Sequence, residues 1–347
     1  MLFRSAFKLA EVEVVTAPDN PPPERKLTRS AVSLNSHKLV VGEEAYRQLK
    51  AEPENVILSI KRLMGRSFSD PILQQQLSHL SYRVSQSTQG TENSLSVWLG
   101  GKEYEPEDIS AEILKKIVQN AQSYQAERGQ TRKVTEAVIT IPAYFNDKQR
   151  HATQTASKRA GLSLRELLSE PTAAAISYGF KADGEDVKTI LVYDFGGGTF
   201  DSSIITAAGN QFIESGKAGD LWLGGDDIDA GIINFVKQEV AREEDIDDID
   251  GLIAKMPNYQ RLRFLGDLKI AVERAKIDLS SAIETRIIPA TPLLDELGMA
   301  VSIDVTLTRE QFEQMVLPLV ERTITICHDA IKYSDYPSEL IDVILLV

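Results

Sequence analysis

The tightest constraint in this sequence is a glycine turn with a carboxylate on each side, Asp194-Phe195-Gly196-Gly197-Gly198-Thr199-Phe200-Asp201. Apolar and β-branched runs flank the turn, so the pattern predicts a strand, a tight turn and a second strand. Glycines carry no Cβ, and their backbone amides can approach an anion closely. Amides for phosphate, a hydroxyl for its terminal oxygens and aspartates for hydrated magnesium suit a nucleoside triphosphate. A purely structural turn is the alternative explanation.

Two other phosphate-binding patterns are excluded by their spacing. Position 201 is aspartate, so the glycine turn is not a G-x-G-x-x-G fingerprint. The Gly216-Lys217 pair lacks a glycine five residues earlier and is followed by Ala218, so it is not a P-loop. The glycine turn is therefore the phosphate candidate of this chain.

The charge balance and the single cysteine limit the partners and the compartment. The 347 residues carry 51 acidic and 38 basic side chains, a formal net charge of −13, which argues against a nucleic-acid partner. Apolar runs such as Val343 to Val347 are far shorter than the roughly 18 residues of a membrane span. Cys327 cannot form an internal disulfide, so we expect a cytoplasmic protein. A mitochondrial presequence at Met1 to Leu9 is the weaker alternative, because acidic residues follow at once.

Hydrophobic periodicity predicts an alternation of helices and strands. A chain of this length exceeds what one core usually holds, so we expect two lobes, with a boundary at the polar segment Ala182 to Asp186. The N-terminal half is predicted to contain a helix at 107–125, a strand at 137–141, a helix from the N-cap Asn146 to about 160, a strand at 164–168 and a short helix ending at Gly179. The C-terminal half is predicted to contain strands at 189–193, 199–207 and 211–214, helices around 228–240 and 262–279, a strand at 301–307, a helix opened by a Thr308/Gln311 capping box and a final strand at 341–347.

Several segments resemble the nucleotide-binding domain of the heat shock protein 70 chaperones, which are members of the actin-like ATPase superfamily. The glycine turn is similar to their second phosphate loop. The other matching segments occur in family order, and they are 60–66 (IKRLMGR), 135–147 (TEAVITIPAYFND), 170–175 (EPTAAA), 223–227 (LGGDD) and 273–280 (ERAKIDLS). The resemblance covers most of residues 40 to 347.

The resemblance implies an α/β fold of the actin-like ATPase class, with two ribonuclease-H-like lobes around a nucleotide cleft. Residues 1–183 would form the first lobe and residues 184–347 the second. The implied function is that of an ATP-binding chaperone domain, which in the intact family couples ATP hydrolysis to protein folding. ATP or ADP and Mg²⁺ are the implied cofactors. A J-domain co-chaperone and a nucleotide exchange factor are the implied partners.

The resemblance also assigns roles in hydrolysis. Lys61 matches the lysine that faces the transferred phosphoryl group, although a surface lysine is the plain alternative. Glu170 matches the carboxylate that orients the attacking water, and simple complementarity with the helix dipole is its rival explanation. Asp194 and Asp201 match residues that organise magnesium through its waters, and Thr199 matches a hydroxyl near the γ-phosphate.

Other matching residues would hold the nucleotide or connect the lobes. Gly196, Gly197 and Gly198 would contact phosphate, and Gly224 and Gly225 match a turn that lines the cleft. The spacing of Glu273, Lys276 and Ser280 places them on one helix face, which in the family holds adenine and ribose. An exposed ion-paired face is the alternative. The residues that match interlobe positions are Tyr144, Asn146, Asp147 and Arg150.

The family pattern is incomplete in this sequence. No glycine occurs before Gly42, so the first phosphate loop of the family has no counterpart there. The sequence ends at Val347, before the glycine pair that holds adenosine, and contains no substrate-binding domain. We therefore expect a chain truncated at both ends, with weak or absent ATP turnover on its own. A non-catalytic interaction module that binds co-chaperones, or a decayed fragment, are the alternatives.

Overall fold

The computed structural model describes residues 14–18, 26–35, 37–77, 80–91, 93–179, 187–209 and 211–347. Contacts divide the chain into two compact units. The first unit comprises Met1–Ile139 and Phe145–Leu167, and the second comprises Thr140–Tyr144 and Leu168–Val347. The predicted boundary segment 182–186 lies outside the described residues, so the predicted division at residue 184 stays a prediction. The mixture of helices and strands confirms an α/β chain.

Two small antiparallel sheets and two long helices form most of the first unit. One sheet has the strand order β2-β1-β3 and the other has the order β4-β5-β6. Helix α3 packs against both sheets and against α4. The elements are β1 (Ala31–Asn35), β2 (Lys38–Val41), α1 (Glu43–Arg47), β3 (Val56–Leu58), α2 (Pro71–Gln76), β4 (Val84–Gln86), β5 (Leu95–Leu99), β6 (Lys102–Tyr104), α3 (Pro106–Glu127), α4 (Asp147–Arg159) and the paired strands β7 (Glu136–Ile141) and β8 (Ser163–Ser169), through which the boundary with the second unit runs.

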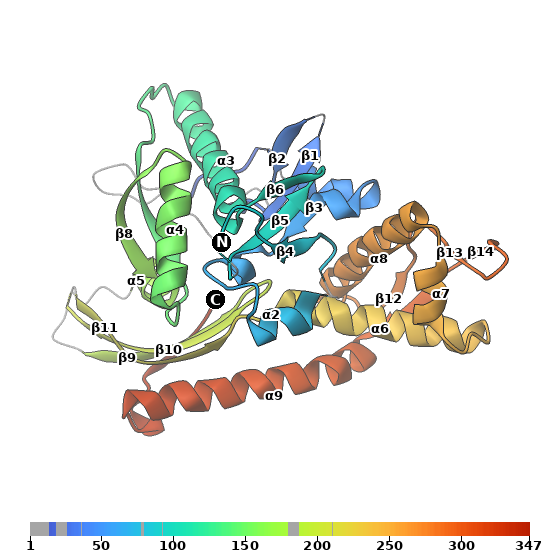
Figure 1. Ribbon diagram of the computed structural model, residues 1–347. Coiled ribbons are helices and arrows are strands. Elements are labelled where there is room, and N and C mark those ends of the chain that lie inside the picture. The colour runs from blue at the N-terminus through green and yellow to red at the C-terminus, as the bar shows by residue number, and fades with distance from the viewer. Residues whose placement is uncertain are drawn as a thin grey trace. The chain divides into compact units, whose positions relative to one another are not determined.

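A four-stranded sheet with the order β11-β10-β9-β16 is the centre of the second unit. Its strands are β9 (Lys188–Phe195), β10 (Phe200–Ala208), β11 (Gln211–Asp220) and β16 (Val343–Leu346). β16 runs parallel to β9, and the other pairs are antiparallel. Helix α5 (Glu170–Tyr178) packs on one face through Ala174 and Ala175. Helix α9 (Arg309–Ser334) packs on the other face and lies along the sheet in Figure 1.

A second core in this unit joins three helices to two short hairpins. Its buried side chains come from α6, α8 and the strands that follow, for example Val236, Leu268 and Leu307. The elements are α6 (Gly225–Glu243), α7 (Ile249–Lys255), α8 (Asn258–Asp278), β12 (Glu284–Ile287), β13 (Leu293–Leu294), β14 (Ala300–Val301) and β15 (Val305–Thr308).

Capping residues fix the helix ends where the sequence predicts them. The Asn146 side chain accepts a hydrogen bond from the Gln149 amide, and the Gln149 side-chain oxygen accepts one from the Asn146 amide. The Thr308/Gln311 box at the start of α9 has the same form. At the end of α5, Gly179 has a φ of 92°, which a residue with a Cβ rarely adopts. These predictions are confirmed.

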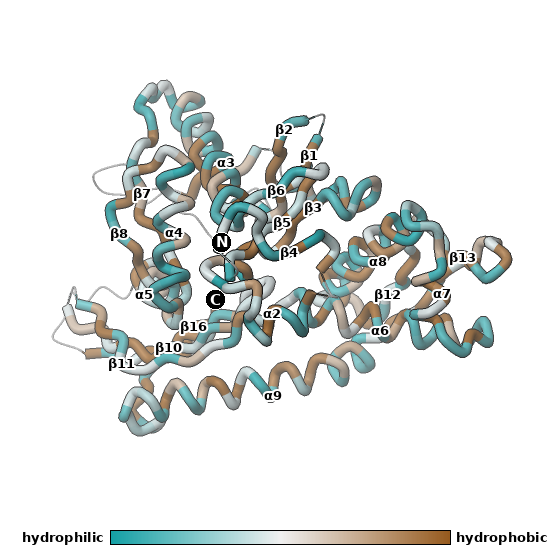
Figure 2. Tube along the Cα trace, viewed as in Figure 1, coloured by the Kyte–Doolittle hydropathy of each residue, from teal (hydrophilic) through white to brown (hydrophobic). Residues whose placement is uncertain are grey.

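The predicted strand at 301–307 is instead divided between two hairpins. β14 pairs with β13, whereas β15 pairs with β12, and Ser302 to Asp304 lies between them. Alternation alone does not reveal that the two ends of such a run have different partners. Polar and apolar residues alternate along α9 in Figure 2. Among the described residues, no helix combines the length and the apolar character that crossing a bilayer requires.

Candidate functional site

Asp194 and Asp201 face each other across the β9–β10 hairpin. They are direct partners in the antiparallel ladder, so their side chains leave the same face of the sheet. This is the face that α5 covers with Ala174 and Ala175, whose neighbours are apolar residues nearer the start of β9. Asp194 is half-buried and Asp201 is only 2% exposed. The two carboxylates therefore lie beside the apolar patch that α5 covers on this sheet face.

The electrostatics of this pair favour a cation. Like charges directly opposite one another in a ladder destabilise a sheet, and burial raises that cost. A hard divalent ion with oxygen ligands would offset the repulsion, and Mg²⁺ commonly uses one or two protein carboxylates and keeps several waters. Within the described ranges, no group of three or more His, Cys, Asp or Glu residues could hold a metal. Two facing carboxylates are a donor set that Mg²⁺ accepts when water completes its coordination shell.

The glycine turn is closed by its own backbone. The Gly196 amide donates to the Thr199 carbonyl at 2.9 Å, and Phe195 pairs with Phe200 directly behind it. The Gly196 amide is thus engaged within the turn. Gly197 is exposed at its tip. The predicted strand–turn–strand is confirmed.

A second glycine pair lies against this turn. A Cβ on Gly224 would be 2.7 Å from the Gly198 nitrogen and 2.8 Å from the Gly196 oxygen, which is closer than real Cβ contacts. The Gly225 amide donates to the Gly196 carbonyl at 3.1 Å, and the Asp226 amide donates to the Gly197 carbonyl at 2.7 Å. The backbone of Gly224 is extended, a conformation that any residue can adopt. Glycine is therefore required at this position by the close contact and not by backbone strain. The two glycine segments therefore form one packed surface.

Helix α6 begins at this contact, and its first amides are already engaged. Besides Gly225 and Asp226, the Asp227 amide donates to the Gly224 carbonyl, and Asp227 Oδ2 accepts from the Gly224 amide at 2.8 Å. The first turn of a helix normally leaves four donors unsatisfied and can attract anions. Here the Gly225 and Asp226 amides hold the glycine turn in place.

An ion-pair network attaches α8 to the start of α6. Lys276 Nζ donates to the Gly225 carbonyl at 3.1 Å and lies 2.6 Å from an Asp229 carboxylate oxygen. Lys269 pairs with Asp226 at 3.2 Å and with Asp229 at 3.7 Å. Burial acts to lower the pKa of Lys269, but these two carboxylates outweigh it and raise that pKa. Lys269 is thus held as a cation at the start of α6, and Lys276 lies beside the glycine surface.

The prediction that three residues share one helix face is correct for two of them. Glu273 and Lys276 lie on α8, but the helix ends at Asp278. Ser280 follows in a turn, where its amide donates to the Ile277 carbonyl at 3.0 Å. The periodic spacing continues past the point where the helical hydrogen bonds stop, which is why spacing alone placed Ser280 on the helix face.

Lys61 lies in the first unit, on the short 3-10 helix Ile60–Leu63. Ser59 precedes this helix with a left-handed φ of 51°, which is uncommon for a residue other than glycine. Gly65 follows it with a φ of 64°, and a Cβ there would be 2.6 Å from the Gln149 nitrogen. The segment that carries Lys61 is thereby packed against the first turn of α4.

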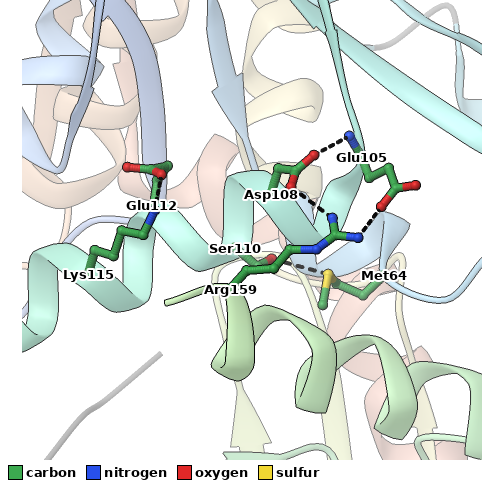
Figure 3. Close-up of polar contacts among 7 residues, drawn as sticks. All are labelled: Met64, Glu105, Asp108, Ser110, Glu112, Lys115 and Arg159. Carbon is green, nitrogen blue, oxygen red and sulfur yellow. Dashed lines mark hydrogen bonds and ion pairs between the residues drawn. The ribbon is translucent and has the colours of Figure 1, made fainter. Parts of the chain in front are cut away.

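Polar contacts around α3 support the same segment (Figure 3). Ser110 Oγ lies 3.1 Å from the sulfur of Met64, three residues after Lys61. From α4, Arg159 binds Asp108 at 2.8 Å and also pairs with Glu105 at the start of α3. These contacts connect α3, α4 and the Lys61 segment into one body.

The residues predicted at interlobe positions lie where the chain passes between the units. Tyr144 belongs to the second unit, and its ring lies over Gly219, whose Cβ would be 2.1 Å from Tyr144 Cε1. Asn146 and Asp147 open α4 in the first unit. The Arg150 Nε donates to the Phe145 carbonyl at 3.1 Å.

Comparison with known proteins identifies the family to which this geometry belongs. A family model described as Hsp70 protein matches residues 8–347. A chaperone protein DnaK from Psychrobacter cryohalolentis is 38% identical over 327 residues, which is 93% of this chain and 47% of that protein. The chain belongs to the Hsp70 family. The predicted resemblance to the Hsp70 family is confirmed, and the chain spans a little under half the length of the relative.

For this Hsp70 chain, the second unit brings many of the predicted site residues together. Asp194 and Asp201 lie on the hairpin, the glycine turn lies against Gly224 and Gly225, and Lys276 reaches the latter. Glu170 is the first residue of α5, which covers the same sheet face as the two carboxylates. Lys61, Asn146, Asp147 and Arg150 belong to the first unit.

Sequence reasoning missed the residues that join α6 to α8. Asp226, Asp229 and Lys269 received no role, although Lys269, Glu273 and Lys276 follow one another at spacings of four and three. The same spacing occurs on many solvent-exposed helices. The packing of α8 on α6 is what distinguishes this helix face from a solvent-exposed one.

Proposed function

We propose that this chain binds ATP and ADP with Mg²⁺ and serves as the ATP-binding domain of an Hsp70-type molecular chaperone. The observation that carries the proposal is the contact of Gly224 with the Gly196–Gly198 turn, beside two carboxylates on one sheet face. Family membership supports the actin-like arrangement, in which two ribonuclease-H-like lobes flank a nucleotide cleft.

In this proposal, phosphate is bound by the glycine turn. The Gly196 amide closes the turn, so Gly197, Gly198 and the Thr199 hydroxyl are the groups proposed to approach the phosphate oxygens. Because residues 224 and 225 have no Cβ atoms, their own backbone can lie directly against the turn. Glu273, Lys276 and Ser280 are proposed to hold the adenosine part.

Asp194 and Asp201 are proposed to hold magnesium through its waters. When bound, Mg²⁺ neutralises negative charge on the phosphate oxygens. The rigid β9–β10 ladder fixes both carboxylates, so little reorganisation is needed on binding.

Hydrolysis is proposed to use Lys61 and Glu170. The Lys61 ammonium would stabilise negative charge that develops on the transferred phosphoryl group, and the Glu170 carboxylate would accept a hydrogen bond from the attacking water. Ser169 caps α5 by accepting from the Thr172 amide, which fixes the helix start that carries Glu170.

The partners proposed from the family are a J-domain co-chaperone and a nucleotide exchange factor. Tyr144, Asn146, Asp147 and Arg150 are proposed to transmit the nucleotide state toward them. Unfolded polypeptide would be bound by a substrate domain of the full-length protein. The single cysteine, which is buried, favours a reducing compartment such as the cytoplasm.

Calorimetry with Mg-ATP and Mg-ADP tests nucleotide binding directly. We expect saturable binding that weakens when magnesium is chelated. No binding at millimolar nucleotide would contradict the proposal. Single-turnover hydrolysis by the wild type and by Lys61→Ala then tests the catalytic part, because the variant should bind nucleotide but cleave it at least tenfold more slowly. Co-chaperone binding without nucleotide binding would instead support a non-catalytic module.

A further inference from the structure

Lys217 is a cation that the proposed nucleotide site does not use. It lies on β11 opposite Ser203, two residues before Gly219, which is the ladder partner of Asp201. Because side chains alternate along a strand, Lys217 and Gly219 share the sheet face of Asp194 and Asp201.

The Lys217 ammonium binds the segment through which the chain enters and leaves the second unit. Its Nζ donates to the Ala143 carbonyl at 2.7 Å. Ala143 is buried, so its carbonyl cannot easily exchange this donor for water. The adjoining residue, Tyr144, lays its ring over Gly219, where a Cβ would collide with it. Ala143 and Tyr144, two consecutive residues of the crossover between the units, therefore both contact β11.

A second cation holds the same segment from within the first unit. The Arg150 Nε donates to the Phe145 carbonyl at 3.1 Å. Ala143 belongs to the second unit and Phe145 to the first, and one residue separates them. Each carbonyl is thus fixed by a cationic side chain of its own unit, with Tyr144 between the two attachments.

We propose that Lys217 is a positioning residue that fastens the crossover Ala143–Phe145 to β11, keeps the Tyr144 ring beside Asp201, and so makes β11 the route by which the nucleotide state reaches α4. The part that concerns nucleotide rests on the proposed function. The fastening itself does not.

Hydrogen–deuterium exchange of peptides spanning 140–150 tests the fastening without nucleotide. Lys217→Met removes the donor but keeps the aliphatic stem, and Lys217→Arg keeps a charged donor. Lys188→Met is the matched control, because Lys188 is an exposed lysine on the same face of the same sheet. We expect exchange in these peptides to be about three- to tenfold faster in Lys217→Met, and near the wild-type rate in the other two variants. Equal exchange in Lys217→Met and wild type would overturn the proposal.

The response to Mg-ADP tests the transmission. We expect Lys217→Met to bind Mg-ADP with the wild-type affinity, because Lys217 is not assigned a contact with the nucleotide. The change in exchange that Mg-ADP causes at residues 145–150 should fall by about half or more, and Lys217→Arg should restore it. A full wild-type response in Lys217→Met would refute the transmission role. If the wild type binds no Mg-ADP, the proposed function fails, and the nucleotide-free comparison still decides the fastening.

Discussion

At the scale of single residues, Gly224 before α6 and Gly231 within α6 have very different surroundings. Gly224 packs against the backbone of Gly196 and Gly198, whereas a Cβ on Gly231 within α6 would meet no atom within 4 Å. Sequence alone shows two glycines seven positions apart. Their surroundings make one indispensable for the site and the other replaceable.

We predict that Gly224→Ala displaces the glycine turn and abolishes measurable ATP binding. The added methyl would overlap backbone atoms that have no room to move, which typically costs about 1–3 kcal/mol of stability. Gly231→Ala should retain ATP affinity and stabilise the chain by about 0.5–1 kcal/mol, since alanine is the better helix former. Calorimetry and urea unfolding measure both effects. Wild-type affinity in Gly224→Ala would argue against the glycine surface as the phosphate site.

Asp194→Asn is predicted to stabilise the nucleotide-free chain and to abolish the effect of magnesium on ATP binding. The substitution removes one of two facing carboxylates and should raise the unfolding free energy of the nucleotide-free chain by about 0.2–1 kcal/mol. ATP affinity in the variant should no longer respond to magnesium. The measurements are unfolding in EDTA and calorimetric titrations with and without Mg²⁺. An unchanged magnesium response would exclude Asp194 as a ligand of its water shell.

At the scale of elements, the start of α3 concentrates negative charge. Glu105 and Asp108 form a capping box and both bind Arg159 (Figure 3). Glu107 lies between them. Burial raises the pKa of the Glu107 carboxyl, and the neighbouring Glu105 and Asp108 charges add to that rise.

This raised pKa predicts the pH dependence of Glu107→Gln. The folded state holds the Glu107 proton more tightly than the unfolded state, so the unfolding free energy of the wild type falls as the pH rises from about 4.5 through the raised pKa. Glutamine removes that loss, and the stability advantage of the variant should grow from acid to neutral pH. Urea unfolding across this range measures it, with the exposed Glu313→Gln on α9 as the control. A constant difference would mean that Glu107 does not titrate in this way.

The helices and strands also show which features local sequence patterns can predict. The Asn146 and Thr308 caps, the end of α5 at Gly179 and the hairpin at 196–199 follow from local rules and were predicted. The division of the strand at 301–307 was not predicted, because it depends on which hairpin each half joins. Ser280 was misplaced for a related reason, since helix length is decided by hydrogen bonds at the end of α8.

At the scale of the whole molecule, the residues with proposed roles are divided between the two compact units. Lys61 belongs to the first unit, and the carboxylates and glycine segments belong to the second. The two tryptophans of the chain divide in the same way, because Trp98 lies on β5 and Trp222 lies just after β11. Each can therefore report on one unit.

We predict that saturating Mg-ATP raises the thermal midpoint seen by both reporters. Trp222→Phe leaves Trp98 to report on the first unit, and Trp98→Phe leaves Trp222 to report on the second. Ligand at 100 times its Kd should stabilise the folded chain by about 2.7 kcal/mol. Adding Lys61→Ala should reduce the shift at Trp98. A shift confined to Trp222 would show that the first unit takes no part in binding.

The sequence by itself determined the family, the long helices, and the hairpin that carries Asp194 and Asp201, because a tight hairpin turn fixes the register of its own strands. Tertiary structure alone decided what rests on that hairpin. Lys217 reaches a carbonyl 74 positions away and Lys276 one 51 positions away, and Gly224 lies against Gly198. Such contacts join segments with no common local pattern. Their formation depends on how the elements pack, and periodicity and spacing describe only the elements.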